Sequence, residues 1–191
     1  MATTILNPNA DVSGNWILST GSDFYAILDY GDNDYVSTTQ VGRSVRMEYD
    51  EFNDSFDSIT SVQACITAYR GGRSGTHDIT VDIENNSNTN YYSDTHTVTV
   101  NGGNPATYCS SAYTTSDGGS TNWTYTDLKY IRIYFQSDEN NADGVNVHSA
   151  YINVVYTEPT VPTPTYTSDD NIVLKNGLME LKNGMIEIKG P

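Results

Sequence analysis

Apolar and polar residues alternate with a period of two along much of the chain, between clusters of Gly, Asn, Asp and Ser. Successive side chains of a β-strand point to opposite faces of a sheet, so each alternating run predicts a strand with one buried face. In the clearest run, Val62, Ala64, Ile66 and Ala68 form the apolar row. Further rows lie in 79–83, 98–100, 131–135 and 150–156, with earlier candidates in 16–18, 24–28 and 45–49.

These eight or nine strands predict an all-β fold, and we expect an antiparallel β-sandwich of jelly-roll type. A small barrel fits less well, because the spacing of the turns is irregular and several loops are long. The composition agrees, since only 17% of the 191 residues are charged and 15 are tyrosines. A chain of this length can form one domain with a sizeable core.

The composition changes abruptly at residue 157, where the chain continues as TEPTVPTPTYTSDD. Proline fixes the backbone and removes a hydrogen-bond donor, so this stretch is typical of a stiff linker or extended arm. We therefore divide the chain into a β-sandwich at 1–156, an arm at 157–170 and a C-terminal segment at 171–191.

A repeat of about seven residues fills the C-terminal segment, at 171–177, 178–184 and 185–190. Its two Asn-Gly pairs are preferred hairpin turns, so the repeat predicts a three-stranded antiparallel meander. A parallel stack is the alternative, but it would align three lysines. In the meander, Glu180 lies opposite Glu187 on the polar face. The apolar face consists of Ile172, Leu174, Met179, Leu181, Ile186 and Ile188.

A lone three-stranded sheet buries too little area to offset its ordering entropy, so the apolar face must be covered. The cover is the chain's own sandwich, a different protein reached by the arm, or the same segment of sister chains. We favour sister chains joined in a three-fold spike. The sequence thus predicts a homotrimer assembled through the six apolar residues.

The 24 acidic residues outnumber the 9 basic ones and give a net charge of -15. Such a charge repels a phosphate backbone, so nucleic acid is excluded as a partner. The sequence contains no apolar stretch of membrane-spanning length, and its first residues do not show the basic-then-apolar pattern of a secretory signal. We therefore expect no membrane insertion.

The residues that could carry catalysis stand apart from one another. His77, His96 and His148 occur singly, without the spacing of a metal site, and the sequence has no nucleophile elbow or phosphate-binding glycine loop. We predict a protein that is not an enzyme and requires no cofactor. Cys65 and Cys109 either form a disulfide or remain two semi-buried thiols.

One acidic turn is a candidate Ca²⁺ site. Asp29, Asp32 and Asp34 lie within six residues, and hard cations prefer several oxygen ligands. The turn lacks the glycine and the downstream acid of an EF-hand loop. A solvated acidic turn is the alternative interpretation of the same residues.

Several tyrosines near loops are a candidate glycan site, because aromatic rings can stack on sugar faces. Tyrosine is also a good strand residue that covers a sheet while its hydroxyl stays hydrated, so packing is the alternative interpretation. The tyrosines concerned are Tyr91, Tyr92, Tyr108, Tyr113 and Tyr125.

Four stretches occur in an informative order: LNPNADVSGNW from Leu6, SITSV from Ser58 with AYR at 68–70, WTYTDL from Trp123, and AYINVVY from Ala150. Together they resemble the jelly-roll-like β-sandwich module of tailed-phage virion structural proteins, of the decoration and fibre type. The resemblance covers about residues 5–157. It implies a component of the virion surface and carries no catalytic residues.

The resemblance and the repeat predict a non-enzymatic structural protein of a tailed-phage virion, in particular an exposed capsid decoration or head-fibre protein. A single sandwich without a long shaft suits the head better than a receptor-binding tail fibre. Its partners would be its own copies and the major capsid protein or another virion protein. The alternative is a glycan-binding tail-fibre tip or lectin-like cell-surface module, which would bind a host surface glycan with the help of Ca²⁺.

Overall fold

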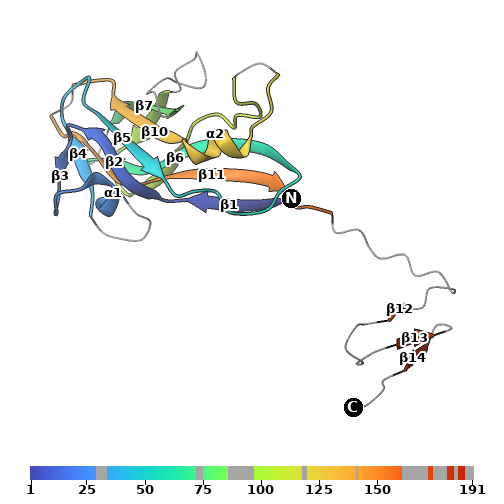
Figure 1. The fold of residues 1–191 in the computed structure, drawn as a ribbon. Coiled ribbons are helices and arrows are strands. Elements are labelled where there is room, and N and C mark those ends of the chain that lie inside the picture. Colours follow the sequence, from blue (N-terminus) through green and yellow to red (C-terminus); the bar gives the residue numbers. More distant parts are fainter. Residues whose placement is uncertain are drawn as a thin grey trace. The chain divides into compact units, whose positions relative to one another are not determined.

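The computed structural model describes residues 1–28, 34–71, 75–85, 97–117, 120–140, 142–160, 172–173, 180–182 and 185–187. The chain divides into two compact units, Met1–Pro159 and Thr160–Pro191 (Figure 1). Strands dominate the described residues, and the two helices are single turns. Among the described residues, no helix is both long and apolar enough to cross a membrane.

The larger unit consists of two antiparallel sheets (Figure 1). One sheet has the order β3 (Ile17–Leu18), β4 (Val36–Thr38), β11 (Val145–Thr157), β6 (Ser58–Arg70) and β9 (Ala106–Cys109), and β1 (Ala2–Leu6) also pairs with β11. The other has the order β2 (Pro8–Gly14), β5 (Ser44–Tyr49), β10 (Arg132–Ser137), β7 (Thr76–Glu84) and β8 (Thr97–Asn101). The predicted all-β sandwich of jelly-roll type is therefore confirmed.

The inner faces of the two sheets share one hydrophobic core. The row of Val62, Ala64, Ile66 and Ala68 on β6 is fully buried, as the alternation predicts. The rows on β7, β8, β10 and β11 are buried in the same way. A hydrogen bond also links the two sheets: the buried hydroxyl of Tyr49 on β5 donates to the carbonyl oxygen of Ala150 on β11 at 3.0 Å. Burial raises the pKa of Tyr49 well above its ordinary value.

The strand predicted at 24–28 is wrong, because this segment contains helix α1 (Phe24–Ile27). The carboxylate of Asp11, on β2, accepts hydrogen bonds from the backbone nitrogens of Phe24 and Tyr25, each at 2.7 Å. These are the first two N–H groups of the helix, which have no partner within it. A contact across 13 residues of sequence thus stabilises a turn that the local alternation does not reveal.

A disulfide joins Cys65 on β6 to Cys109 on the edge strand β9. The two residues are direct partners in the antiparallel register, with their Cα atoms 4.1 Å apart. The structure thus selects the disulfide from the two states that the sequence leaves open.

The smaller unit contains three short strands, β12 (Ile172–Val173), β13 (Glu180–Lys182) and β14 (Met185–Glu187), in a sheet of their own. Both pairings are antiparallel, so the predicted meander is confirmed over the parallel stack. Glu180 faces Glu187 in the register, as the hairpin arrangement requires. Of the six predicted assembly residues, Leu174, Met179 and Ile188 lie outside the described residues.

Candidate functional site

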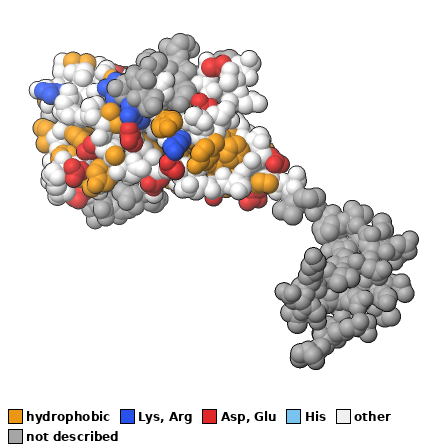
Figure 2. Space-filling model, viewed as in Figure 1, with side chains coloured by type: hydrophobic (Ala, Val, Ile, Leu, Met, Phe, Trp, Pro, Cys, Tyr) orange, Lys and Arg blue, Asp and Glu red, His pale blue; other side chains and the backbone are white. Residues whose placement is uncertain are grey.

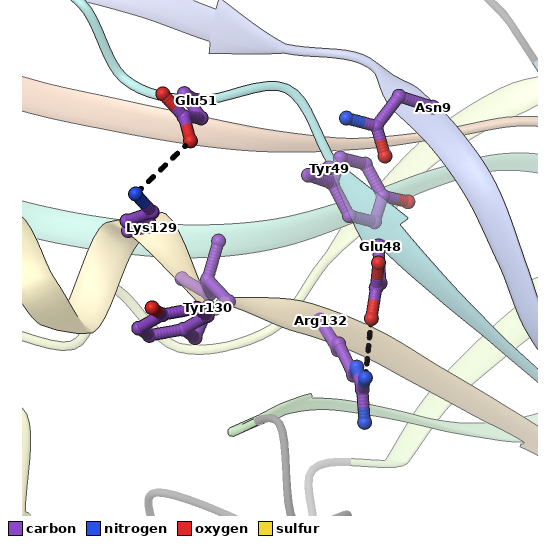
Figure 3. A pocket seen from close by; sticks show the side chains of 8 residues that line it. Asn9, Glu48, Tyr49, Glu51, Lys129, Tyr130 and Arg132 are labelled. Carbon is purple, nitrogen blue, oxygen red and sulfur yellow. Dashed lines mark hydrogen bonds and ion pairs between the residues drawn. The ribbon is translucent and has the colours of Figure 1, made fainter.

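A pocket of about 420 Å³ opens beside α2 (Tyr125–Lys129), at the ends of β2, β5 and β10 (Figure 3). A volume of this size lies within the usual range for small-molecule sites. The pocket is lined by Asn9, Glu48, Tyr49, Glu51, Lys129, Tyr130, Ile131 and Arg132.

Buried neighbours position Lys129 and Tyr130 at the mouth of the pocket. Leu128 and Ile131 are almost fully buried, whereas the two residues between them are exposed. The helix begins at a capping box, in which Thr124 and Asp127 each accept a hydrogen bond from the other's backbone nitrogen. Tyr130 therefore keeps 45% of its surface exposed on a firmly anchored segment.

Strand register places the opposite wall of the pocket. Glu48 on β5 is the direct partner of Arg132 on β10, and their side chains form an ion pair. Asn9 lies where the pairing of β2 with β5 shifts by one residue, between Pro8 and Ala10. Such bulges re-aim side chains, and here the shift accompanies an amide that reaches the pocket.

A second ion pair joins Lys129 and Glu51 at 3.4 Å. Figure 3 shows this pair across the pocket from the Glu48–Arg132 pair, with the ring of Tyr130 on the Lys129 side. The hydrogen bond with Glu51, followed by the charge of Glu51, raises the pKa of Lys129. The ammonium group is therefore charged at neutral pH, and the pocket contains two cations and two carboxylates.

The polar row continues along the outer face of the same sheet. Arg46 on β5 binds Glu84 on β7 at 2.8 Å and lies over the ring of Tyr134 on β10, 4.3 Å from its centroid. Burial raises the pKa of Tyr134, and its hydroxyl donates to Gln136. On the face shown in Figure 2, basic side chains accordingly lie beside acidic and hydrophobic ones. The cations of this face are thus engaged within the fold.

The structure tests little of the predicted Ca²⁺ site. Asp29 and Asp32 lie outside the described residues, and the carboxylate of Asp34 accepts a hydrogen bond from the Thr20 hydroxyl at 2.8 Å. Within the described part of the chain, no group of three or more His, Cys, Asp or Glu side chains could hold a metal ion. The calcium site remains a prediction from the sequence.

Three of the five tyrosines of the predicted glycan site lie within the described residues. Tyr91 and Tyr92 lie outside the described residues, and Tyr113 is buried. The hydroxyl of Tyr108 accepts a hydrogen bond from a backbone nitrogen at 2.9 Å, so packing accounts for this ring. Tyr125 remains 44% exposed on α2 but does not line the pocket.

Of the two tyrosines that line the pocket, Tyr49 is buried and Tyr130 is exposed, and neither belongs to the predicted site. The outward positions of Glu48 and Arg132 could have been read from the alternation of their strands. Their pairing, however, depends on a register between segments 84 residues apart.

A serine, a histidine and a carboxylate also lie close together beside β7 and β10, but the serine and the histidine are closed to solvent. The Nε2 atom of His77 lies 2.8 Å from the Ser137 hydroxyl, and its Nδ1 atom lies 3.9 Å from Glu139. Both His77 and Ser137 are fully buried, and the Ser137 hydroxyl donates to the backbone oxygen of Glu139. A nucleophile must reach its substrate, so this buried cluster is not a candidate catalytic site.

A second, smaller cavity of about 190 Å³ lies beside β3 and β4. Its lining includes the exposed side chain of Ile17 and the guanidinium of Arg43, which donates to Gln40 at 2.9 Å. The cavity lacks an aromatic wall. The pocket beside α2 is therefore the better candidate of the two.

No protein-family model and no curated protein sequence matches the chain. Similar solved structures include the CBM36-1 domain of a multidomain xylanase from the hindgut metagenome of Trinervitermes trinervoides. Its TM-score is 0.45 at 11% identity, over 83% of this chain and 100% of that domain. The xylan-binding module CBM15 has a TM-score of 0.46 at 8% identity, over 83% of this chain and 99% of the module.

A bacteriophage protein is also among the similar structures. The enzymatically active domain of tailspike protein 4 of bacteriophage CBA120 has a TM-score of 0.37 at 13% identity, over 80% of this chain and 19% of that one. These neighbours are thus carbohydrate-binding β-sandwich modules and part of a tailspike. With TM-scores below 0.5, the similarities do not establish a shared function, which has to be argued from the pocket.

Proposed function

We propose that the protein is a non-catalytic glycan-binding module whose binding site is the pocket beside α2. The observation that carries the proposal is the exposed, anchored ring of Tyr130 at the edge of a polar pocket of about 420 Å³. A sugar ring has an apolar C–H face and an edge of hydroxyl groups. It therefore needs a flat aromatic surface next to convergent polar groups, and this pocket combines the two.

Each wall has a role in this proposal. The Tyr130 ring covers the C–H face of a sugar, while the carboxylates of Glu48 and Glu51 accept hydrogen bonds from hydroxyl groups. Asn9 and Lys129 supply donors for sugar oxygens. Both carboxylates are already engaged by cations, which favours holding a ligand over proton transfer to one.

The test is a titration of the isotopically labelled full chain with neutral and acidic oligosaccharides, followed by NMR. Binding at the pocket should shift the amide signals of 48–51 and 129–132. Signals from Ile17 and Thr38, beside the second cavity, serve as the internal control and should stay in place. A titration in which no oligosaccharide shifts the pocket signals, or in which only the control signals move, would contradict the proposal.

The C-terminal unit supports a second proposal, namely that it assembles copies of the chain into a homotrimer. The supporting observation is its separate antiparallel sheet, too small to be stable alone. Light scattering should give a trimeric mass for the full chain and a monomeric mass for a chain ending at Thr157. Equal association states for the two chains would contradict the assembly role.

Placement on a tailed-phage virion, as a capsid decoration or fibre protein, is proposed on the resemblance of the sequence alone. A virion protein would be made in the host cytoplasm and displayed on the particle surface. Mass spectrometry and immunogold labelling of purified particles would test the placement, and particles that lack the chain would contradict it.

A further inference from the structure

Within each ion pair of the pocket, the two side chains differ in their exposed fraction. The side chain of Arg132 is 11% exposed, whereas that of its partner Glu48 is 47% exposed. Lys129 is 41% exposed, whereas its partner Glu51 is 50% exposed. In both pairs the carboxylate is thus the more exposed member, most clearly for Glu48. The pocket therefore presents acceptor oxygens to a ligand, with the positive charge behind or beside them.

We infer that the pocket selects uncharged glycans and rejects glycans that carry carboxylate or sulfate groups. This inference rests on the proposed glycan-binding function and adds the chemical class of the ligand. An anionic sugar would have to approach two exposed carboxylates, and the positive charge of each nearby cation is already balanced by one of them. The net charge of -15 on the chain adds a repulsion at longer range.

An uncharged sugar meets neither obstacle. Its hydroxyl groups can donate to the carboxylates of Glu48 and Glu51, which are strong acceptors because they are ionised. Arg132 and Lys129 hold these carboxylates in place, so the acceptors are oriented before a ligand arrives. An ammonium group carries three N–H donors, so a single bond from Lys129 to Glu51 leaves donors for a sugar oxygen.

The experiment uses matched ligands that differ at C6, where the uronic acid carries a carboxylate in place of the primary hydroxyl group. The full chain is titrated calorimetrically with oligosaccharides of glucose, mannose and galactose, and with the same oligosaccharides oxidised at C6 to the uronic acids. Each oxidised ligand should bind about tenfold more weakly than its neutral parent at physiological salt. The deficit should narrow at 1 M salt, where the Debye length falls to about 3 Å.

A pair of substitutions removes the two negative charges of the pocket and leaves its two positive charges, with little change in shape. In the double variant Glu48→Gln and Glu51→Gln, the ratio of the dissociation constant of the oxidised ligand to that of its neutral parent should fall by at least about tenfold. The reason is that the cations lose the carboxylates paired with them. The matched control, Asp23→Asn with Glu158→Gln, removes two exposed charges outside the pocket and should leave the preference unchanged.

The outcomes distinguish a failure of the predicted selectivity from a failure of the glycan-binding proposal on which it rests. If neutral and oxidised forms bind equally, or the oxidised forms bind better, the selectivity is refuted while glycan binding stands. If none of these oligosaccharides binds, the glycan-binding proposal itself fails. If the double variant does not fold, as thermal unfolding would show, the comparison of matched ligands on the unsubstituted chain still decides the inference.

Discussion

Replacing Tyr130 with alanine should weaken glycan binding by an amount that the exposure of its ring defines. A tyrosine presents about 200 Å² to solvent, of which 45% remains exposed here, so about 90 Å² is open to a ligand. If a sugar covers between half and all of this area, burial contributes about 1–2 kcal/mol at about 25 cal/mol per Å². The dissociation constant of Tyr130→Ala should therefore rise about 5- to 30-fold.

The chain offers a matched control for this substitution. Tyr125 is 44% exposed at the start of α2, the helix that precedes Tyr130, but does not line the pocket, so Tyr125→Ala removes a similarly exposed ring from outside the site. Calorimetric titration of the full chain and both variants with one neutral oligosaccharide gives the two ratios. Tyr125→Ala should stay within about twofold of the unsubstituted chain.

Two results would refute the reasoning. An unchanged dissociation constant in Tyr130→Ala would show that the ring does not contact the ligand. Equal losses in the two variants would show that exposed rings act non-specifically, or that the ligand lies along α2 and not in the pocket. Thermal unfolding of each variant should change little, because exposed side chains contribute little to stability.

Three further predictions concern stability and assembly. Replacing Cys65 and Cys109 with serine should lower the free energy of unfolding by about 2–4 kcal/mol, because the disulfide closes a loop of 44 residues. Denaturant titrations measure this loss, and an unchanged unfolding midpoint would contradict it. Burial lowers the pKa of His77, so its contribution to stability should be complete above about pH 6.5 and be lost as the pH falls below that value. The stability advantage over His77→Gln should shrink from pH 7 to pH 5, and a constant difference would contradict this. Leu181→Asp should abolish self-association in light scattering while the thermal transition of the larger unit persists; an unaltered mass would refute the assembly face.

The sequence predicts the core of the sandwich well because each core row is a local pattern. Every second residue of 62–68 is buried, and this follows from strand geometry alone. The segment at 24–28 shows where such reasoning fails, because Phe24–Leu28 is a short apolar run that fits a buried strand or a helical turn equally well. Its helix depends on the carboxylate of Asp11, which no pattern within 24–28 contains. The short strands β1, β2 and β9 also lack a distinct local alternation.

The candidate site was harder to predict because it joins three distant parts of the chain, around residues 9, 48–51 and 129–132. The tyrosines near predicted loops include Tyr125, but Tyr130 follows a helical turn that the sequence pattern does not predict. Asn9 reaches the pocket where the pairing of β2 with β5 is irregular, and such irregularities depend on the partner strand. Strand pairing thus decides which residues line the pocket, and the pattern within one segment does not show which strands pair.

The same core that defines the fold also orients the pocket. Tyr49 and Ile131 belong both to the core and to the lining, and Leu128 anchors the helix that precedes Tyr130. The bond from the Tyr49 hydroxyl to Ala150 fixes this end of β5 to the opposite sheet. The polar lining side chains therefore belong to backbone segments that are held by buried neighbours, and these segments need little ordering on binding a ligand. For the proposed glycan site, preorganisation of this kind reduces the binding energy that is lost to ordering side chains.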